Sequence, residues 1–140
     1  MISIALNNSV KKPLPQSAII NFLRSSLSYL KLYNVELSVA FVAEPVSRRL
    51  NRSYRGLDHS TDILSFVFAK DKKNLDGELV ICYAVALRQA RESGHALRQE
   101  IMRLLAHGLL HLIGYDHQRT KETAAMEKME NILLVHSKFN

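Results

Sequence analysis

The 140-residue sequence has a single cysteine, no long hydrophobic run and no repeated or low-complexity segment. One cysteine, Cys82, excludes an internal disulfide framework and favours a reducing compartment. No apolar run reaches the ~18–20 residues that a membrane-spanning helix needs. The first residues lack the basic and apolar regions of a signal peptide. We therefore expect one domain, residues 1–140, located in the cytoplasm.

The composition is that of an ordinary globular domain, with 47% hydrophobic and 23% charged residues. Lys and Arg number 19 against 13 Asp and Glu, which leaves a net charge of +6. This excess favours polyanionic partners, nucleic acid first. Cys82 lies in the apolar run 79–83, so we expect a buried structural thiol and not a nucleophile.

The pattern of apolar residues predicts an α+β domain. Strands are expected at residues 2–7, 35–43, 63–68 and 78–83. Helices are expected at residues 16–33, 45–55, 84–93, 96–113 and 121–136. Gly56 and Gly94 stand where they would end the second and third helices, and Asp76-Gly77 predicts a turn between the last two strands. This order predicts one mixed sheet of about four strands, covered by about five helices.

Three of the six histidines lie within eleven residues: His107 and His111 in the helix expected at 96–113, and His117 just after it. Residues four apart share a helix face, so His107 and His111 can reach one point. On a continuing helix His117 would lie roughly 9 Å further along the axis, so the chain must turn back, and Gly114 is placed to allow this. A chance match to the spacing is expected only about 0.01 times per chain. The spacing predicts a three-histidine metal site, as opposed to ordinary core or surface histidines of an amphipathic helix.

Three imidazoles suit zinc best, although other divalent transition metals also bind such sites. They leave a fourth position for water, whose pKa zinc lowers to about 7, so the site is that of a hydrolase. The spacing matches the metzincin proteases except that Gly108 replaces their glutamate general base. That replacement argues against a peptidase. A phosphodiester fits better, because a metal and an arginine such as Arg55 can stabilise its anionic transition state.

The segment His107–His117, with the sequence HGLLHLIGYDH, resembles the metal-binding signature of the YbeY-type bacterial endoribonucleases. Residues 50–56 together with Asp58, residues 61–66, and residues 77–82 resemble other blocks of that family. The chain departs from the family pattern at Val67, where proline is usual, and at Glu78, where aspartate is frequent. Neither position is a predicted metal ligand.

The resemblance implies a zinc-dependent endoribonuclease, with one ion per chain and a preference for single-stranded RNA. It further implies a role in processing the 3′ end of 16S ribosomal RNA and in ribosome quality control, with the small ribosomal subunit and its factors as partners. His107, His111 and His117 carry over as metal ligands, and Arg55 as a basic residue of the active-site cleft. These four residues are the catalytic candidates.

Other residues near the signature, and two other functions, stay open. Asp116 is either an acceptor for a ligand imidazole or a solvated turn residue, and Tyr115 is expected to pack. His59, His95 and His136 are expected to be surface or structural residues. One alternative function is a zinc hydrolase of peptides or esters. The other is a ribosome- or RNA-binding factor whose metal is mainly structural.

Overall fold

The computed structural model describes residues 1–115 and 120–138, which form one α+β domain. Its elements, in chain order, are β1 (Ile2–Asn8), α1 (Gln16–Tyr29), β2 (Asn34–Val42), α2 (Glu44–Arg55), β3 (Ile63–Lys70), β4 (Asn74–Cys82), α3 (Tyr83–Ser93), α4 (Leu97–Leu112) and α5 (Thr120–Lys138). The predicted fold class, with four strands and five helices, is confirmed. None of the helices in the described ranges is long and apolar enough to cross a membrane.

The four strands form a single mixed sheet in the order β1-β2-β4-β3. The β1–β2 and β2–β4 pairs are parallel, whereas β3 runs antiparallel to β4 and forms one edge of the sheet. The register places Ile4 beside Leu37 and Val39 beside Leu79, so that apolar side chains of neighbouring strands lie on the same face. Alternation along each strand therefore creates one strongly apolar face.

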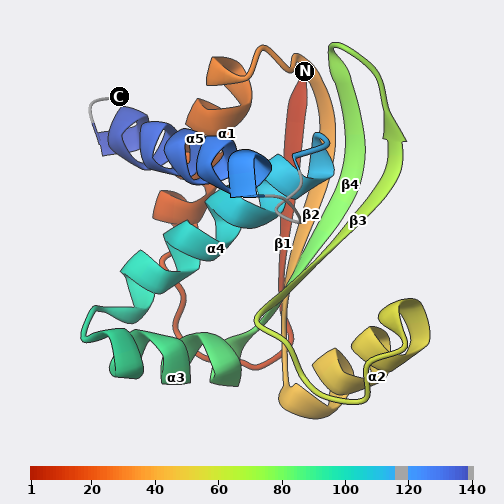
Figure 1. Cartoon of the computed structure of the whole chain (residues 1–140), viewed down its shortest axis with the longest axis vertical. Helices are drawn as coiled ribbons and strands as arrows, with labels where there is room; N and C mark the ends of the chain where they lie inside the picture. The colour runs from red at the N-terminus through yellow and green to blue at the C-terminus, as the bar shows by residue number, and fades with distance from the viewer. Residues whose placement is uncertain (116–119, 139–140) are drawn as a thin grey trace.

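Helices α1, α4 and α5 cover this apolar face, and α4 lies nearest the centre of the core (Figure 1). Five leucines of α4 are at most 1% exposed, namely Leu104, Leu105, Leu109, Leu110 and Leu112. A helix that is apolar over most of its surface has to be buried to be stable. Because its buried leucines fix α4 in the core, the side chains on the face of α4 that is not buried are held in place as well.

Helix α2 lies alone on the opposite face of the sheet (Figure 1). Its Val46 and Leu50 pack against a small second cluster made by Ala40, Val42, Leu64 and Val80. This cluster holds α2 against the end of the sheet at which β3 begins. Cys82 is 1% exposed at the end of β4, and burial raises the pKa of its thiol, as expected for a structural cysteine.

Helix α1 is shorter than the apolar pattern predicted, because it ends at Tyr29 and not at Tyr33. Lys31 adopts a left-handed conformation, with φ of 61°. The N–H of Leu32 then donates to the carbonyl of Leu27, and the Leu32 side chain turns into the core. This geometry is a Schellman ending, in which the apolar residue after the turn contacts the last helical turn. Leu32 therefore continues the apolar pattern although the helix has ended.

The predicted turn at Asp76-Gly77 is wrong, because both residues lie inside β4. The β3–β4 hairpin turns instead around Asp71, whose carboxylate accepts hydrogen bonds from the backbone N–H groups of Lys73 and Asn74. A Cβ at Gly77 would lie 2.9 Å from the Phe66 carbonyl oxygen. Glycine at this position thus permits close packing in the sheet and does not mark a turn.

Candidate functional site

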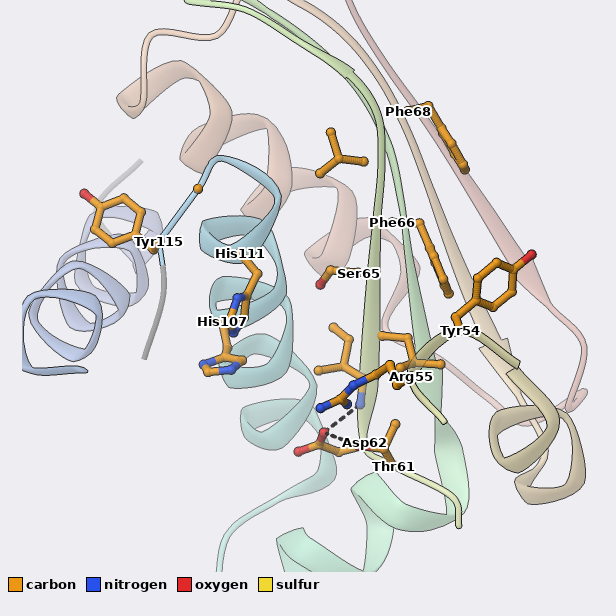
Figure 2. Close-up of a pocket in the computed structure, with 14 residues that line it drawn as sticks. Tyr54, Arg55, Thr61, Asp62, Ser65, Phe66, Phe68, His107, His111 and Tyr115 are labelled. Atoms are coloured by element: carbon orange, nitrogen blue, oxygen red, sulfur yellow. Dashed lines mark hydrogen bonds between the residues drawn. The ribbon is translucent and has the colours of Figure 1, made fainter. Parts of the chain in front are cut away.

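Helix α4 presents His107 and His111 on one face, one helical turn apart. Their ring centroids are 4.7 Å apart and the rings are tilted by 74°. Figure 2 shows both imidazoles on the same side of α4, in front of the helix. Two imidazoles at this spacing can contribute to one metal centre, because residues four apart are neighbours on a helix.

The chain turns after α4 at Gly114, as the sequence predicted. Gly114 has φ of 104°, a value that L residues rarely adopt. Its N–H donates to the His111 carbonyl oxygen at 3.1 Å, and the Tyr115 N–H donates to that of Leu110 at 3.0 Å. These two bonds form a Schellman ending that stops the helix directly after the histidine pair.

The predicted third ligand, His117, lies outside the described residues, as does Asp116. Within residues 1–115 and 120–138, no three His, Cys, Asp or Glu side chains are arranged to hold a metal ion. The three-histidine centre therefore stays a prediction, and two of its three candidate ligands lie in the described residues. Tyr115 packs against the edge of the core, as expected.

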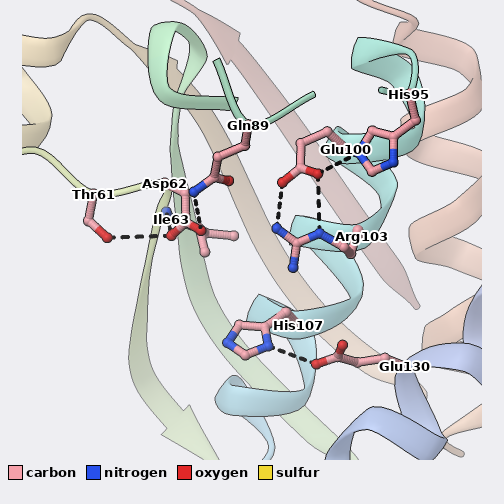
Figure 3. A network of polar contacts seen from close by, with 9 residues as sticks. All are labelled: Thr61, Asp62, Ile63, Gln89, His95, Glu100, Arg103, His107 and Glu130. Carbon is pink, nitrogen blue, oxygen red and sulfur yellow. Dashed lines mark hydrogen bonds and ion pairs between the residues drawn. The ribbon is translucent and has the colours of Figure 1, made fainter. Parts of the chain in front are cut away.

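A carboxylate that the sequence did not identify contacts the first histidine. Glu130 of α5 places Oε1 2.7 Å from Nδ1 of His107 (Figure 3). Since an ionised carboxylate only accepts, Nδ1–H is the donor, and a metal ion would be bound through Nε2. Carboxylates commonly orient ligand imidazoles in this way. The histidine pair and Glu130 thus fit a metal centre, although no local sequence pattern links residues 23 positions apart.

Gly108 lies where α4 approaches the sheet most closely. A Cβ at this position would be 2.6 Å from Ile63 Cδ1 and 2.9 Å from Leu79 Cδ2. The Ser65 hydroxyl donates to the Gly108 carbonyl oxygen at 3.3 Å. Any side chain at position 108 would therefore point into the sheet and away from the histidine pair. A glutamate at this position would have to displace Ile63 and Leu79 and would not reach the histidine pair, which adds a structural reason to the argument against a peptidase.

The two histidines line a groove of about 1050 Å³. Arg55, at the end of α2, lines the same groove, together with residues 61–68 of the loop and strand that follow. Figure 2 shows Arg55 directed toward the space in front of α4. The structure thus brings the predicted basic residue to the histidine pair, although its catalytic role stays a prediction.

The other arginines of α2 have different surroundings. Arg48 forms a bidentate pair with Asp58, at 2.9 and 3.0 Å, and Arg52 lies 3.5 Å from the same carboxylate. The hydrogen bond from Arg48 holds the pKa of Asp58 below its usual range. These pairs fix the loop that follows α2, and Gly56, with φ of 72°, ends the helix just before it. Arg55 is thereby placed on the groove side of that loop.

Asp62 is a second carboxylate for which the sequence alone predicts no role, and it lines the groove. It accepts hydrogen bonds from the Ile63 N–H at 2.7 Å and from the Gln89 side chain at 3.3 Å (Figure 3). These contacts hold it at the start of β3, on the side of the groove that Arg55 occupies in Figure 2.

The three other histidines of the described residues, His59, His95 and His136, do not line the groove. His95 Nε2 is 2.8 Å from Oε1 of the buried Glu100, which also binds Arg103 (Figure 3). His59 is exposed and contacts a neighbouring backbone carbonyl, and the His136 ring lies 4.9 Å from that of Tyr29. All three are surface or structural residues, as expected.

Known proteins are similar to this chain in sequence and in fold. A model of the family described as endoribonuclease YbeY matches residues 4–138. An endoribonuclease YbeY of Aromatoleum aromaticum is 41% identical over 120 residues, which cover 86% of this chain and 75% of that protein. One of Aquifex aeolicus is 43% identical over 112 residues, covering 78% and 75%. The solution structure of TM1509 from Thermotoga maritima aligns with a TM-score of 0.66 at 25% identity, covering 98% of this chain and 89% of that one.

The match covers nearly the whole domain, including the groove and both described histidines. The chain belongs to the endoribonuclease YbeY family.

Proposed function

We propose that this protein is a zinc-dependent endoribonuclease that cleaves single-stranded RNA in ribosomal RNA processing. The observation that carries the proposal is the pairing of an oriented histidine, His107, with His111 and Arg55 in one open groove. Membership of a family named for endoribonuclease activity supports RNA as the substrate. The net charge of +6 favours a polyanion.

Each residue of the groove has a distinct part in this proposal. His107, His111 and the predicted ligand His117 would hold the metal, and Glu130 orients His107. A bound zinc ion would supply Lewis-acid activation of water and of the phosphoryl oxygen. Arg55 binds the scissile phosphate and stabilises the charge that develops on it.

The family resemblance extends the proposal to the biological substrate. We assign the enzyme to processing of the 3′ end of 16S ribosomal RNA and to ribosome quality control. Its partners are then the small ribosomal subunit and associated factors, in the cytoplasm. A single buried cysteine suits that reducing compartment.

The test is cleavage of single-stranded RNA by the zinc-loaded protein, with casein as the alternative substrate. His111→Ala is expected to lose both zinc and RNA cleavage. Arg55→Ala is expected to keep zinc while its cleavage rate falls roughly 10²–10³-fold, the usual loss for one donor to a developing anion. Arg49→Ala, which removes an exposed arginine outside the groove, is the matched control and keeps full activity.

Other outcomes have clear meanings. RNA cleavage that persists in His111→Ala indicates a contaminating nuclease and refutes the proposal. Full cleavage by zinc-loaded Arg55→Ala removes the role given to Arg55. Casein cleavage identifies a peptidase, and RNA binding without cleavage identifies an RNA-binding factor with a structural metal.

A further inference from the structure

Three aromatic side chains gather where the groove passes over the edge strand β3. Tyr54 of α2 and Phe66 and Phe68 of β3 all line it. Tyr54 is 68% exposed and Phe68 65% exposed. The Tyr54 and Phe66 rings meet edge to face, with centroids 5.0 Å apart. Single exposed apolar residues are ordinary, but here three aromatic side chains line one groove, and two of them are in contact.

We infer that Tyr54, Phe66 and Phe68 form a base-stacking surface, here called the aromatic face, for nucleotides that flank the cleaved bond. The inference rests on the proposed function and specifies how that site holds its RNA. Aromatic rings bind single strands by stacking on successive bases, and every base offers a π-face. The aromatic face therefore selects exposed bases without selecting their sequence.

The alternation of β3 separates the aromatic face from the metal side. Ser65 points toward α4, where its hydroxyl bonds the Gly108 carbonyl. Phe66 points to the opposite face, where it packs against the small cluster that includes Leu64 and Val80. Figure 2 accordingly shows the histidines in front of α4, and Tyr54, Phe66 and Phe68 on the other side of β3. A nucleotide chain in this groove crosses the edge of the sheet.

Phe68 owes its position to an irregularity in β3. The pairing with β4 shifts register between Val67 and Ala69, so Phe68 has no partner in the β3–β4 ladder. A bulge redirects the side chain at which it occurs. Phe68 and Phe66 remain two residues apart, about 6.6 Å along a strand. This spacing allows two bases of an extended strand to stack in succession.

The charges around the aromatic face favour a polyanion at the edge of the sheet only. Arg55 follows Tyr54 directly, so a phosphate bound by Arg55 brings its neighbouring base within reach of the Tyr54 ring. Further across the same face of the sheet lie the carboxylates of Glu36, Asp76 and Glu78. They repel a phosphate backbone. The RNA path is thereby confined to β3, with its phosphates on the Arg55 side.

A base inside a duplex is already stacked on its neighbours, and stacking it on a protein side chain would require the duplex to be unstacked first, at a cost of about a few kcal/mol per step. The aromatic face would thus supply the preference for single-stranded RNA, whereas the metal and Arg55 act on any phosphodiester. Base–aromatic stacking contributes roughly a five- to 150-fold factor in affinity for each base. Loss of one ring should therefore weaken binding measurably without removing it.

The experiment measures binding of a short single-stranded RNA to the full chain. The RNA carries 2′-O-methyl groups in place of its 2′-hydroxyls, and these limit cleavage during the measurement. Tyr54→Leu and Phe68→Leu are each expected to lower affinity at least fivefold, with the salt dependence unchanged because phosphate contacts remain. Tyr33→Leu, an exposed tyrosine outside the groove, is the matched control and leaves affinity unchanged. Phe66 is spared because it also packs in the small cluster.

A fluorescent reporter separates stacking from simple proximity. The chain has no tryptophan, so Phe68→Trp introduces a single emitter at the aromatic face. Its emission is expected to be quenched by the RNA and not by an abasic strand of equal length. Equal quenching by both strands, or unchanged affinity of Tyr54→Leu and Phe68→Leu, overturns the inference.

The outcome is independent of the cleavage assay. Base-dependent quenching without RNA cleavage by the zinc-loaded wild type would leave the aromatic face standing and refute the nuclease. RNA cleavage with no base-dependent quenching would support the nuclease and refute the aromatic face. RNA that fails to bind at all overturns the aromatic face and favours a protein partner for these rings.

Discussion

Gly108 connects the packing of α4 on the sheet with the position of the two histidines. It lies between the two histidines in sequence, yet it faces the sheet, with Ile63 and Leu79 directly below it. The absence of a side chain allows α4 to lie close to β3 and β4. That close approach sets how far His107 and His111 stand from the opposite wall of the groove.

Gly108→Ala is expected to destabilise the fold by about 1–2 kcal/mol. Overpacking of a core costs about 1–3 kcal/mol, of which the better helix propensity of alanine returns up to about 1 kcal/mol. The urea midpoint measures the change, and Arg98→Ala, at an exposed position of the same helix, serves as control. Wild-type stability of Gly108→Ala would show that Ile63 and Leu79 move aside freely.

Glu130 is the residue whose role the structure adds to the site. Glu130→Gln should lower zinc affinity about 10–100-fold, because the amide cannot stabilise the donated Nδ1–H as a carboxylate does. Zinc competition with a chelator measures it. Glu127→Gln removes the same charge from an exposed position of α5 and should change little. Equal losses in both variants would indicate a general charge effect instead of the His107 contact.

At the scale of elements, helix ends decide where the functional side chains lie. Gly56 and Gly114 both have positive φ and stop α2 and α4 immediately after residues of the groove. Arg55 and His111 are consequently held by rigid helices at the point where the chain turns away. Helix α1 ends in the same manner but has Lys31 at the left-handed position, where an L residue destabilises the fold relative to glycine.

Lys31→Gly is therefore expected to stabilise the protein by about 0.5–1 kcal/mol. Glycine adopts a positive φ without the ~1–2 kcal/mol cost borne by an L residue, although it returns part of that gain through a more flexible unfolded chain. Lys31→Ala removes the same charge, keeps the Cβ and should give no gain. Thermal unfolding of the two variants side by side decides, and equal stability would contradict the helix-end argument.

At the scale of the whole molecule, the protonation of the buried carboxyl of Glu100 affects the free energy of unfolding at low pH. Glu100 is 1% exposed and contacts Arg103 and His95. Burial by itself raises the pKa of this carboxyl, but the hydrogen bonds from Arg103 and His95 outweigh it and hold the pKa below the ordinary 4.5. A carboxyl whose pKa is lower in the folded state stabilises the fold above its unfolded pKa. That stabilisation is lost as pH falls through the folded value.

Glu100→Gln should accordingly cost roughly 1.5–3 kcal/mol at pH 7, the usual loss for hydrogen bonds to a charged group. The difference from wild type should shrink as pH falls from about 4.5, the ordinary pKa that applies in the unfolded chain, through the lower pKa of the folded state, where the buried carboxyl itself becomes protonated. Urea midpoints between pH 7 and pH 3 test this. Glu92→Gln, at an exposed site, is the control. A difference that is constant with pH would contradict the assigned protonation.

Local patterns were sufficient to predict most of the fold. Apolar periodicity and glycine positions located every helix and strand of the described chain, because propensity, alternation and helix endings depend on residues close in sequence. The two errors arose where a residue had another reason to be present. Leu32 is apolar because it packs after the helix has ended, and Gly77 is a glycine because Phe66 lies against it.

The spacing of His107 and His111 was also enough to place both imidazoles on one helix face and to predict the turn at Gly114. The end of its helix made Arg55 a candidate for binding a phosphate, but its place in the cleft with the histidines came from family resemblance, and the contact of Glu130 with His107 came from the structure alone. Contacts of this kind join segments that are distant in sequence, and their formation depends on how α2, α4 and α5 pack around the sheet. The sequence by itself determined which residues carry the chemistry of the helix, and the tertiary structure decided which other residues they meet, because packing is set by the whole core and not by any local pattern.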